Sequence, residues 1–235
     1  MKHTLLIKDW LSSFLSLLFP HCCVVCGRPL AKGEECICTV CNINLPRTNY
    51  HLRKDNPVER LFWGQIPLER ATSFFFYEKG SDFRLILHRL KYGGQKEIGA
   101  IMGRYMAAKL LSSNFFQGID VIIPIPLHKK KQQIRGYNQS EWIARGIAAV
   151  TGIPIDTESI LRKKNTETQT RKSVFERRDN VEGIFELQHP ETLAGKHILI
   201  VDDVLTTGST TLACASCLVN VEGIRISILT LAMVE

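Results

Sequence analysis

The sequence lacks any uninterrupted apolar run of the ~18 residues that a membrane-spanning helix requires. Its apolar N-terminal stretch is broken by Asp9, and no small-x-small cleavage site follows. We therefore expect neither a secretory signal nor stable membrane insertion. No Gly-Lys-Ser/Thr follows a glycine-rich loop, which excludes a P-loop nucleotide site. No cysteine stands at position 2, where it could act as a terminal nucleophile, and the length leaves no room for a glutaminase domain. We therefore do not expect an enzyme that takes ammonia from glutamine.

The composition is that of a globular protein with a positive surface. Of the 235 residues, 45% are hydrophobic and 23% are charged, and the formal net charge is +7. Such a balance can fill a core, and the excess of Lys and Arg indicates anionic partners, either phosphorylated small molecules or nucleic acid. Aromatic residues make up only 8% of the chain, so stacking on single-stranded nucleic acid gains no support from composition.

Residues 1–20 are expected to form an amphipathic helix. Apolar residues recur every four positions at Leu6, Trp10, Phe14 and Leu18, which gives one apolar stripe along the helix. Such a stripe packs on its own domain in most proteins. The alternative is a helix that docks on a partner or a membrane surface.

Residues 21–46 contain six of the eight cysteines, and four of these form two C-x-x-C pairs. The pairs are Cys23 with Cys26 and Cys38 with Cys41, separated by eleven residues. A short loop can bring two such pairs together as a tetrahedral thiolate site for structural Zn²⁺. A redox C-x-x-C motif is the alternative, and the remaining cysteines Cys22 and Cys36 could replace a neighbour as ligand. Clustered thiols favour a reducing compartment, hence the cytoplasm.

Residues 47–67 are polar and contain two prolines, and we interpret them as a linker. Residues 68–235 alternate strand and helix patterns, which predicts an α/β fold with a mainly parallel sheet and helices on both faces. The expected strands are 71–77, 121–125, 183–187, 197–201 and 224–232, with a further one beginning at 160–161. The expected helices are 83–90, 98–111, 140–150 and 210–219.

The most informative segment runs from Ile198 to Thr211. Four apolar residues are followed by Asp202 and Asp203, at the carboxyl end of a strand, where open α/β sheets place their ligands. A loop of small and hydroxyl residues then leads into a helix and can cradle a phosphate with backbone N–H groups. Adjacent carboxylates would repel a bare phosphate, but they accept hydrogen bonds from a sugar diol. A phosphorylated sugar satisfies both halves, through Asp202 and Asp203 and through Thr206, Thr207, Gly208, Ser209 and Thr210.

This segment resembles the signature of type I phosphoribosyltransferases, which bind 5-phosphoribosyl 1-pyrophosphate (PRPP). Further stretches resemble the ComF family, so that the similarity covers nearly the whole chain: Leu90–Tyr92, Pro124–His128, Arg135–Gln139, Thr166 with Gln169, Arg178–Val181 and the N-terminal cysteine pairs. The resemblance implies a zinc knuckle, a phosphoribosyltransferase-type domain and an association with DNA uptake in competent bacteria. Three lysines stand at Lys129–Lys131 where the family pattern has Pro and Arg, and positive charge is retained.

Two further segments are expected to flank the sugar. Lys130, Lys131 and Arg135 lie where this fold carries its pyrophosphate loop, and they would stabilise the leaving pyrophosphate. A solvated basic turn or a nucleic-acid patch is the alternative for the lysines. Residues 163–180 are charged and nearly free of apolar residues; as a catalytic lid they would bring Gln169 and Arg178 over the sugar and exclude water. A disordered surface loop is the alternative there. Lys91 is a weaker candidate for contact with PRPP.

The sequence thus predicts a PRPP-binding phosphoribosyltransferase with an unidentified, nitrogen-containing acceptor. Mg²⁺ bound mainly by PRPP itself would neutralise charge on the departing pyrophosphate. The alternative is a binding protein without catalysis, which keeps PRPP as an effector and engages single-stranded DNA or a DNA-uptake helicase. A third possibility is an adaptor that docks a partner through residues 1–20.

Overall fold

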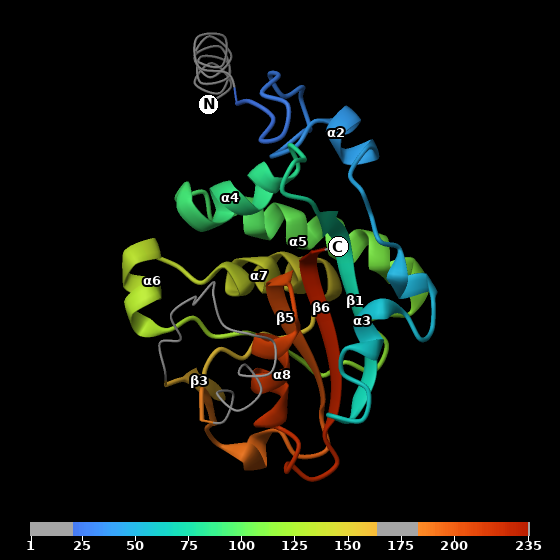
Figure 1. The fold of residues 1–235 in the computed structure, drawn as a ribbon, viewed down its shortest axis with the longest axis vertical. Helices are drawn as coiled ribbons and strands as arrows, with labels where there is room; N and C mark the ends of the chain where they lie inside the picture. The colour runs from blue at the N-terminus through green and yellow to red at the C-terminus, as the bar shows by residue number, and fades with distance from the viewer. Residues whose placement is uncertain (1–20, 164–182, 235) are drawn as a thin grey trace, which may run out of the picture.

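The computed structural model describes residues 21–163 and 183–234. Its centre is a parallel four-stranded sheet in the order β1-β6-β5-β2 (Figure 1). The strands are β1 (Leu68–Tyr77), β2 (Val121–Pro124), β5 (His197–Leu205) and β6 (Arg225–Val234). All three strand pairings are parallel, as predicted, so the carboxyl ends of the strands meet at one edge of the sheet.

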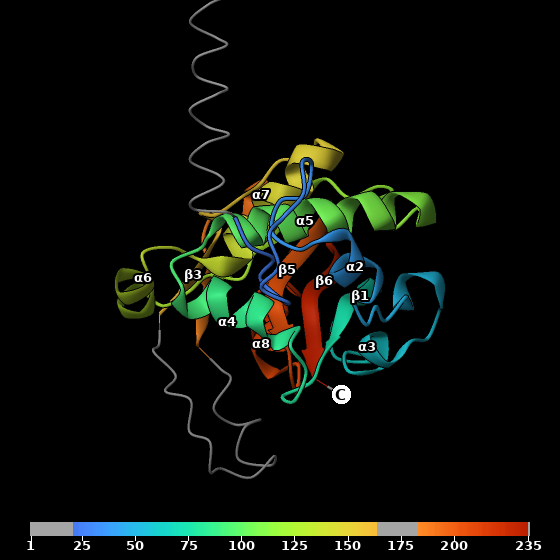
Figure 2. The same cartoon turned by 90° about the horizontal axis from the view of Figure 1, so that it is seen from above.

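Helices cover both faces of this sheet, which confirms the predicted fold class. Successive side chains of a strand point to opposite faces, and β5 shows the consequence. Leu199 and Val201 pack in the cluster formed with α5 (Glu97–Leu110) and α7 (Gln139–Thr151). Ile198 and Ile200 pack in the cluster formed with α3 (Pro57–Arg60) and α8 (Ser209–Ser216). Figure 2 shows the two layers on either side of the strands.

Helices α5 and α7 approach each other closely because glycine lies at their crossing. A Cβ atom on Gly103 would lie 2.2 Å from the carbonyl oxygen of Ile143, and one on Gly146 would lie 2.0 Å from that of Ala100. Backbone atoms cannot move aside as a flexible side chain can. The crossing therefore fixes where α7 begins, and α7 begins beside the acidic pair described below.

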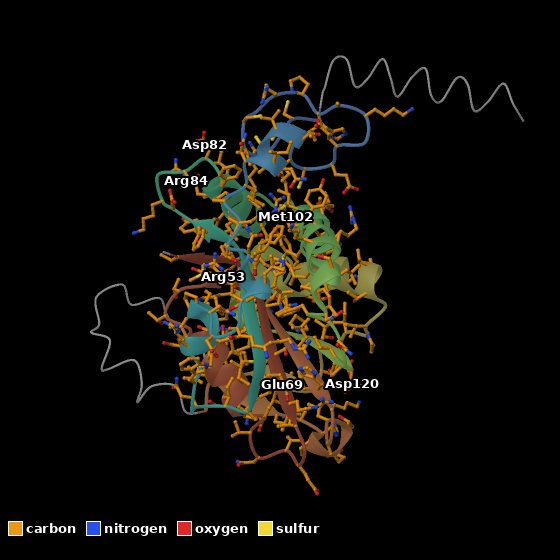
Figure 3. The ribbon with its side chains drawn as sticks, turned by 90° about the vertical axis from the view of Figure 1, so that its right-hand side faces the viewer. Arg53, Glu69, Asp82, Arg84, Met102 and Asp120 are labelled. Carbon is orange, nitrogen blue, oxygen red and sulfur yellow. The ribbon has the colours of Figure 1, made fainter. Side chains whose placement is uncertain are left out.

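The cysteine-rich segment packs on α5 and does not stand apart from the sheet. Its short helix α2 (Thr39–Ile43) begins at Cys38. The Cys36 Sγ lies 3.9 Å from the Met102 Sδ, and Arg104 forms an ion pair of 2.5 Å with Glu35. In Figure 3 Met102 lies between this segment and the sheet. The cysteines thus share one hydrophobic cluster with α5 and α7.

Residues 47–67 hold the short helices η1 (Tyr50–Leu52) and α3 against strand β1. The Asn56 side chain accepts from the backbone N–H groups of Val58 and Glu59, and it donates to the carbonyl oxygen of Ala71 at 2.9 Å. Phe62 is fully buried, in the cluster that α8 also joins. The segment interpreted as a linker is therefore a packed part of the described fold; the division of the chain into domains stays a prediction.

Several elements are longer or additional relative to the sequence expectations. Strand β5 continues through the two acids to Leu205, and residues 129–135, expected as a loop, form helix α6 (Lys129–Arg135). Strands β3 (Ile160–Arg162) and β4 (Phe185–Leu187) form a separate antiparallel pair. The remaining elements are α4 (Arg84–Tyr92), η2 (Leu111–Ser113) and η3 (Pro190–Thr192). No helix within residues 21–163 and 183–234 is long and apolar enough to cross a membrane.

Candidate functional site

The acidic pair lies near the carboxyl end of β5. Asp202 is buried and accepts a hydrogen bond of 3.1 Å from the Ser140 hydroxyl, at the start of α7. The same carboxylate oxygen accepts from the backbone N–H of Asp203 at 2.8 Å. Asp203 is more exposed and forms an ion pair with Lys91, with 3.2 Å between Nζ and Oδ2. Two carboxylates, one hydroxyl and one ammonium thus meet at the end of the central strand.

The surroundings of Asp202 disfavour its charge. Burial, followed by the neighbouring Asp203 carboxylate, raises the pKa of Asp202 from 3.8 to about 7. The hydrogen bonds from Asp203 N–H and Ser140 and the charge of Lys91 act in the opposite direction and do not outweigh burial. A carboxyl that titrates near neutrality, beside a second carboxylate, is typical of a site where a ligand is bound or a proton is exchanged.

The loop after β5 turns into α8 through a glycine. Gly208 precedes α8 with φ of +75°, a conformation that side chains other than glycine rarely adopt. A Cβ there would also lie 3.4 Å from the Phe62 ring, so the loop rests on the fully buried aromatic of segment 47–67. The Thr207 and Ser209 hydroxyls are 2.8 Å apart, and Thr206, Thr207 and Thr210 are exposed. The N-terminus of α8 adds positive potential to these donors.

Lys91, in the last turn of helix α4, lies at the acidic pair. The basic helix α6 lies near the same end of α4. The Arg135 guanidinium, at the end of α6, lies 5.6 Å from the centre of the Tyr92 ring. Lys129 and Lys130 are exposed on α6, with Lys131 partly exposed beside them. The backbone N–H of Lys130 donates to the side chain of His128, which caps this helix at its N-terminus. The structure thus places Lys91 in direct contact with the pair, and Arg135 beside the residue that follows Lys91.

Some sequence candidates cannot be placed. Gln169 and Arg178, together with Thr166 and Arg177, lie outside the described residues. The chain enters that gap at Lys163, directly after β3, and returns at Gly183, before β4. The lid stays a prediction.

Three residues near the site were not among the sequence candidates. Ser140 and Tyr137 reach it across the fold, Ser140 to Asp202 and Tyr137 to the carbonyl oxygen of Leu90 at 2.5 Å. Arg162 is largely buried over the Phe185 ring; burial lowers its pKa, and the charge of Asp202 opposes that effect. The contact of Ser140 spans 62 residues of sequence, and no local pattern could have revealed it.

The four cysteines of the two pairs come together. Their sulfur atoms all lie within 4.8 Å of one another, and the Sγ atoms of Cys26 and Cys38 are 3.7 Å apart. In a tetrahedral zinc–thiolate site with bonds of about 2.3 Å, the sulfur atoms lie about 3.8 Å apart. The side chain of Arg28 donates to Cys26 and lowers the pKa of that thiol to about 6. Cys23, Cys26, Cys38 and Cys41 therefore fit a zinc ion in geometry and in chemistry.

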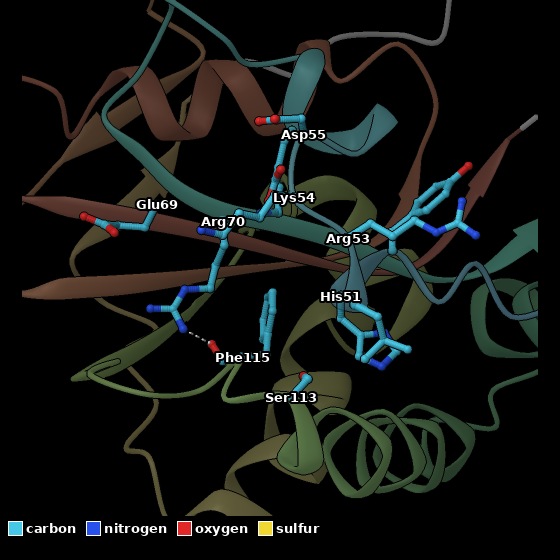
Figure 4. Close-up of a pocket in the computed structure, with 12 residues that line it drawn as sticks. His51, Arg53, Lys54, Asp55, Glu69, Arg70, Ser113 and Phe115 are labelled. Atoms are coloured by element: carbon cyan, nitrogen blue, oxygen red, sulfur yellow. Dashed lines mark hydrogen bonds between the residues drawn. The ribbon is translucent and has the colours of Figure 1, made fainter.

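A cavity of about 510 Å³ opens at another place, beside the edge strand β1 (Figure 4). Its charged lining combines three cations with three acids: Arg53, Lys54, Arg70, Asp55, Glu59 and Glu69. Arg70 is already engaged, because Nη1 donates to the carbonyl oxygens of Asn114 and Phe115. Neither the acidic pair nor the loop after β5 lines this cavity. Mixed charge selects no class of ligand, so the acidic pair is the better candidate site.

Known proteins resemble this chain to different degrees. The Phosphoribosyl transferase domain family matches residues 138–234. The chain is similar to the DNA utilization protein YhgH of Escherichia coli O157:H7, with 32% identity over 209 residues that cover 83% of this chain and 88% of that protein. It is similar to Competence protein ComFC of Bacillus subtilis strain 168, with 25% identity and coverage of 88% and 75%. Among solved structures, adenine phosphoribosyltransferase from Leishmania tarentolae shows 12% identity, coverage of 80% and 94%, and a TM-score of 0.38.

Proposed function

Since the chain belongs to the ComF family, we propose that it binds PRPP with Mg²⁺ and transfers the phosphoribosyl group to a nitrogen acceptor. The observation that carries the proposal is the acidic pair followed at once by the threonine–glycine loop, at the carboxyl end of β5. Asp202 and Asp203 would accept from the ribose hydroxyls. Thr206, Thr207, Gly208, Ser209 and Thr210 would hold the 5-phosphate, a few ångströms away.

The transfer is a substitution at C1 of the ribose. The bond between C1 and the pyrophosphate oxygen breaks, and its electron pair leaves with pyrophosphate. The acceptor nitrogen forms the new bond to C1 and loses its proton. Positive side chains would stabilise the charge that grows on the leaving group; Lys91, Lys130, Lys131 and Arg135 are the candidates. Gln169 and Arg178 would close over C1 and exclude water.

Two metals belong to the proposal. Mg²⁺, bound mainly by PRPP itself, would neutralise the charge of the pyrophosphate. Zn²⁺ held by Cys23, Cys26, Cys38 and Cys41 would be structural, since four thiolates close its coordination shell. Thiolate ligands require a reducing compartment, which favours the cytoplasm.

A second candidate function rests on helix α6. No residue of α6 is buried, and Lys129, Lys130 and Ile134, which is 88% exposed, face solvent. A non-catalytic protein could keep PRPP as an effector and bind single-stranded DNA, or a DNA-uptake helicase, through this surface. The names of the relatives refer to DNA utilization and competence, which favours a role in DNA uptake under either candidate.

The first experiment tests the ligand. PRPP with Mg²⁺ should raise the melting temperature, because a ligand of the folded state stabilises it by mass action. Replacement of Asp202 and Asp203 together by Asn should abolish this rise while the protein stays folded. An equal rise in the double variant would refute the assignment.

The second experiment separates enzyme from binder. Pyrophosphate release from PRPP is measured across a panel of nucleobases and amines, beside a titration with single-stranded DNA at two salt concentrations. Faster release with one acceptor supports the transferase. No release with any acceptor, together with DNA affinity that PRPP alters and high salt weakens, supports the second candidate.

A further inference from the structure

The last turn of α4 is held by three different parts of the candidate site. Leu90 accepts a hydrogen bond of 2.5 Å from the Tyr137 hydroxyl, through its carbonyl oxygen. Lys91 forms the ion pair with Asp203. The ring of Tyr92 lies under the Arg135 guanidinium. Three consecutive residues thus tie the acidic pair to the segment that joins α6 and α7.

The ion pair places a cation on a carboxylate that the proposed function assigns to the ribose hydroxyls. A diol that binds Asp203 must compete with the Lys91 ammonium. In PRPP the pyrophosphate is attached at C1, directly beside these hydroxyls. The lysine stem has four carbons and rotates freely, so the ammonium can exchange Asp203 for pyrophosphate oxygens. Ribose 5-phosphate offers no anion at C1, so a Lys91 ammonium that leaves Asp203 gains no new partner.

We propose that Lys91 is a specificity-determining residue, which leaves Asp203 for the pyrophosphate when PRPP binds and disfavours ribose 5-phosphate by remaining on Asp203. This inference rests on the proposed function and adds to it a way to distinguish substrate from its monophosphate. Tyr137 is a positioning residue in this arrangement, since its hydroxyl holds the carbonyl oxygen next to Lys91.

The test compares two ligands by calorimetric titration of the full chain with Mg²⁺. Lys91→Met keeps the apolar stem and removes the charge. PRPP affinity should fall, ribose 5-phosphate affinity should stay or rise, and the ratio of the two should fall on the order of tenfold or more, the usual effect of losing one charged contact. Lys91→Arg should restore part of the preference, and Tyr137→Phe should lower it by less than Lys91→Met.

Arg84→Met is the matched control. Arg84 is the first residue of the same helix and donates to the carbonyl oxygen of Lys79 (Figure 3). Its loss removes the same charge without touching the acidic pair, so both affinities should change alike and the ratio should stay. A Lys91→Met protein that loses both affinities by one factor, or keeps both, overturns the inference. If wild type binds neither ligand, the proposed function fails as well.

Discussion

Asp202→Asn should stabilise the protein, and the gain should grow with pH. The carboxyl titrates at about 7 in the folded protein and at 3.8 in the reference state. Its folded pKa is raised, so the folded state binds more protons than the unfolded state between these two values. Stability from this group is therefore lost as pH rises from about 4 to about 7. An Asn side chain is permanently neutral and can still accept from Ser140 and from the Asp203 N–H.

The magnitude follows from the two pKa values. One pKa unit corresponds to about 1.4 kcal/mol, so a rise from 3.8 to about 7 gives an upper limit of about 4 kcal/mol for the cost of ionised Asp202. The buried amide of Asn carries a desolvation cost of its own, so we expect a gain of roughly half this limit, about 2 kcal/mol at pH 8. For a chain of this size that is a rise of about 4–8 °C in melting temperature.

The assay is thermal unfolding of wild type and variant, side by side, at pH 5.5 and pH 8. The difference between the two proteins at one pH cancels the titration of the cysteines and histidines, which both proteins share. The variant should be more stable at pH 8 and should gain less at pH 5.5. A loss of stability at pH 8, or an equal gain at both pH values, would show that burial does not disfavour the ionised form of Asp202.

Three further predictions concern other parts of the fold. Cys38→Ser should release zinc in a metal analysis and lower the melting temperature of the whole protein, because the cysteines share a cluster with α5. Gly146→Ala should destabilise by about 1–3 kcal/mol in denaturant unfolding, since its Cβ would meet Ala100 O at 2.0 Å; Gly80→Ala, where nothing lies within 4 Å, should be neutral. Burial lowers the pKa of His197, so its contribution to the free energy of unfolding is complete above about pH 6.5 and is lost on acidification. His197→Gln should therefore reduce the loss of stability below pH 6.5.

The sequence was most informative where chemistry is encoded locally. The apolar run before Asp202 predicted a strand with a ligand site at its carboxyl end, and the glycine after two threonines predicted the loop that follows. The cysteine spacing predicted a cluster that the fold assembles. The structure of residues 129–135 was less clear from the sequence, because a run of lysines without apolar periodicity is compatible with a solvated turn. The helix that forms there begins after the cap by His128 and ends at Gly136, which has φ of +82°.

Contacts between distant segments could not be predicted. Segment 47–67 has the composition of a linker, yet Asn56 pairs with Ala71 and Phe62 supports Gly208. The first contact depends on the edge of β1, 15 positions along the chain, and the second on the loop after β5; neither leaves a local signal in the segment itself. Lys91 was a weaker candidate because a lone lysine at the end of a helix carries no signal of its own. Its partner, Asp203, lies more than a hundred positions away.

The surroundings of Asp202 connect helix packing to the chemistry of the site. Gly103 and Gly146 let α7 lie close against α5, and the first turn of α7 supplies the hydroxyl of Ser140 that donates to Asp202. Burial, more than the charge of Asp203, raises the pKa of the carboxyl, and the Ser140 hydrogen bond acts against that rise. A substitution at the glycine crossing should therefore alter the ionisation of Asp202 without contact with it. The small residues of α5 and α7 thus do more than permit packing: their crossing sets the position of Ser140, one of the groups that determine the pKa of Asp202.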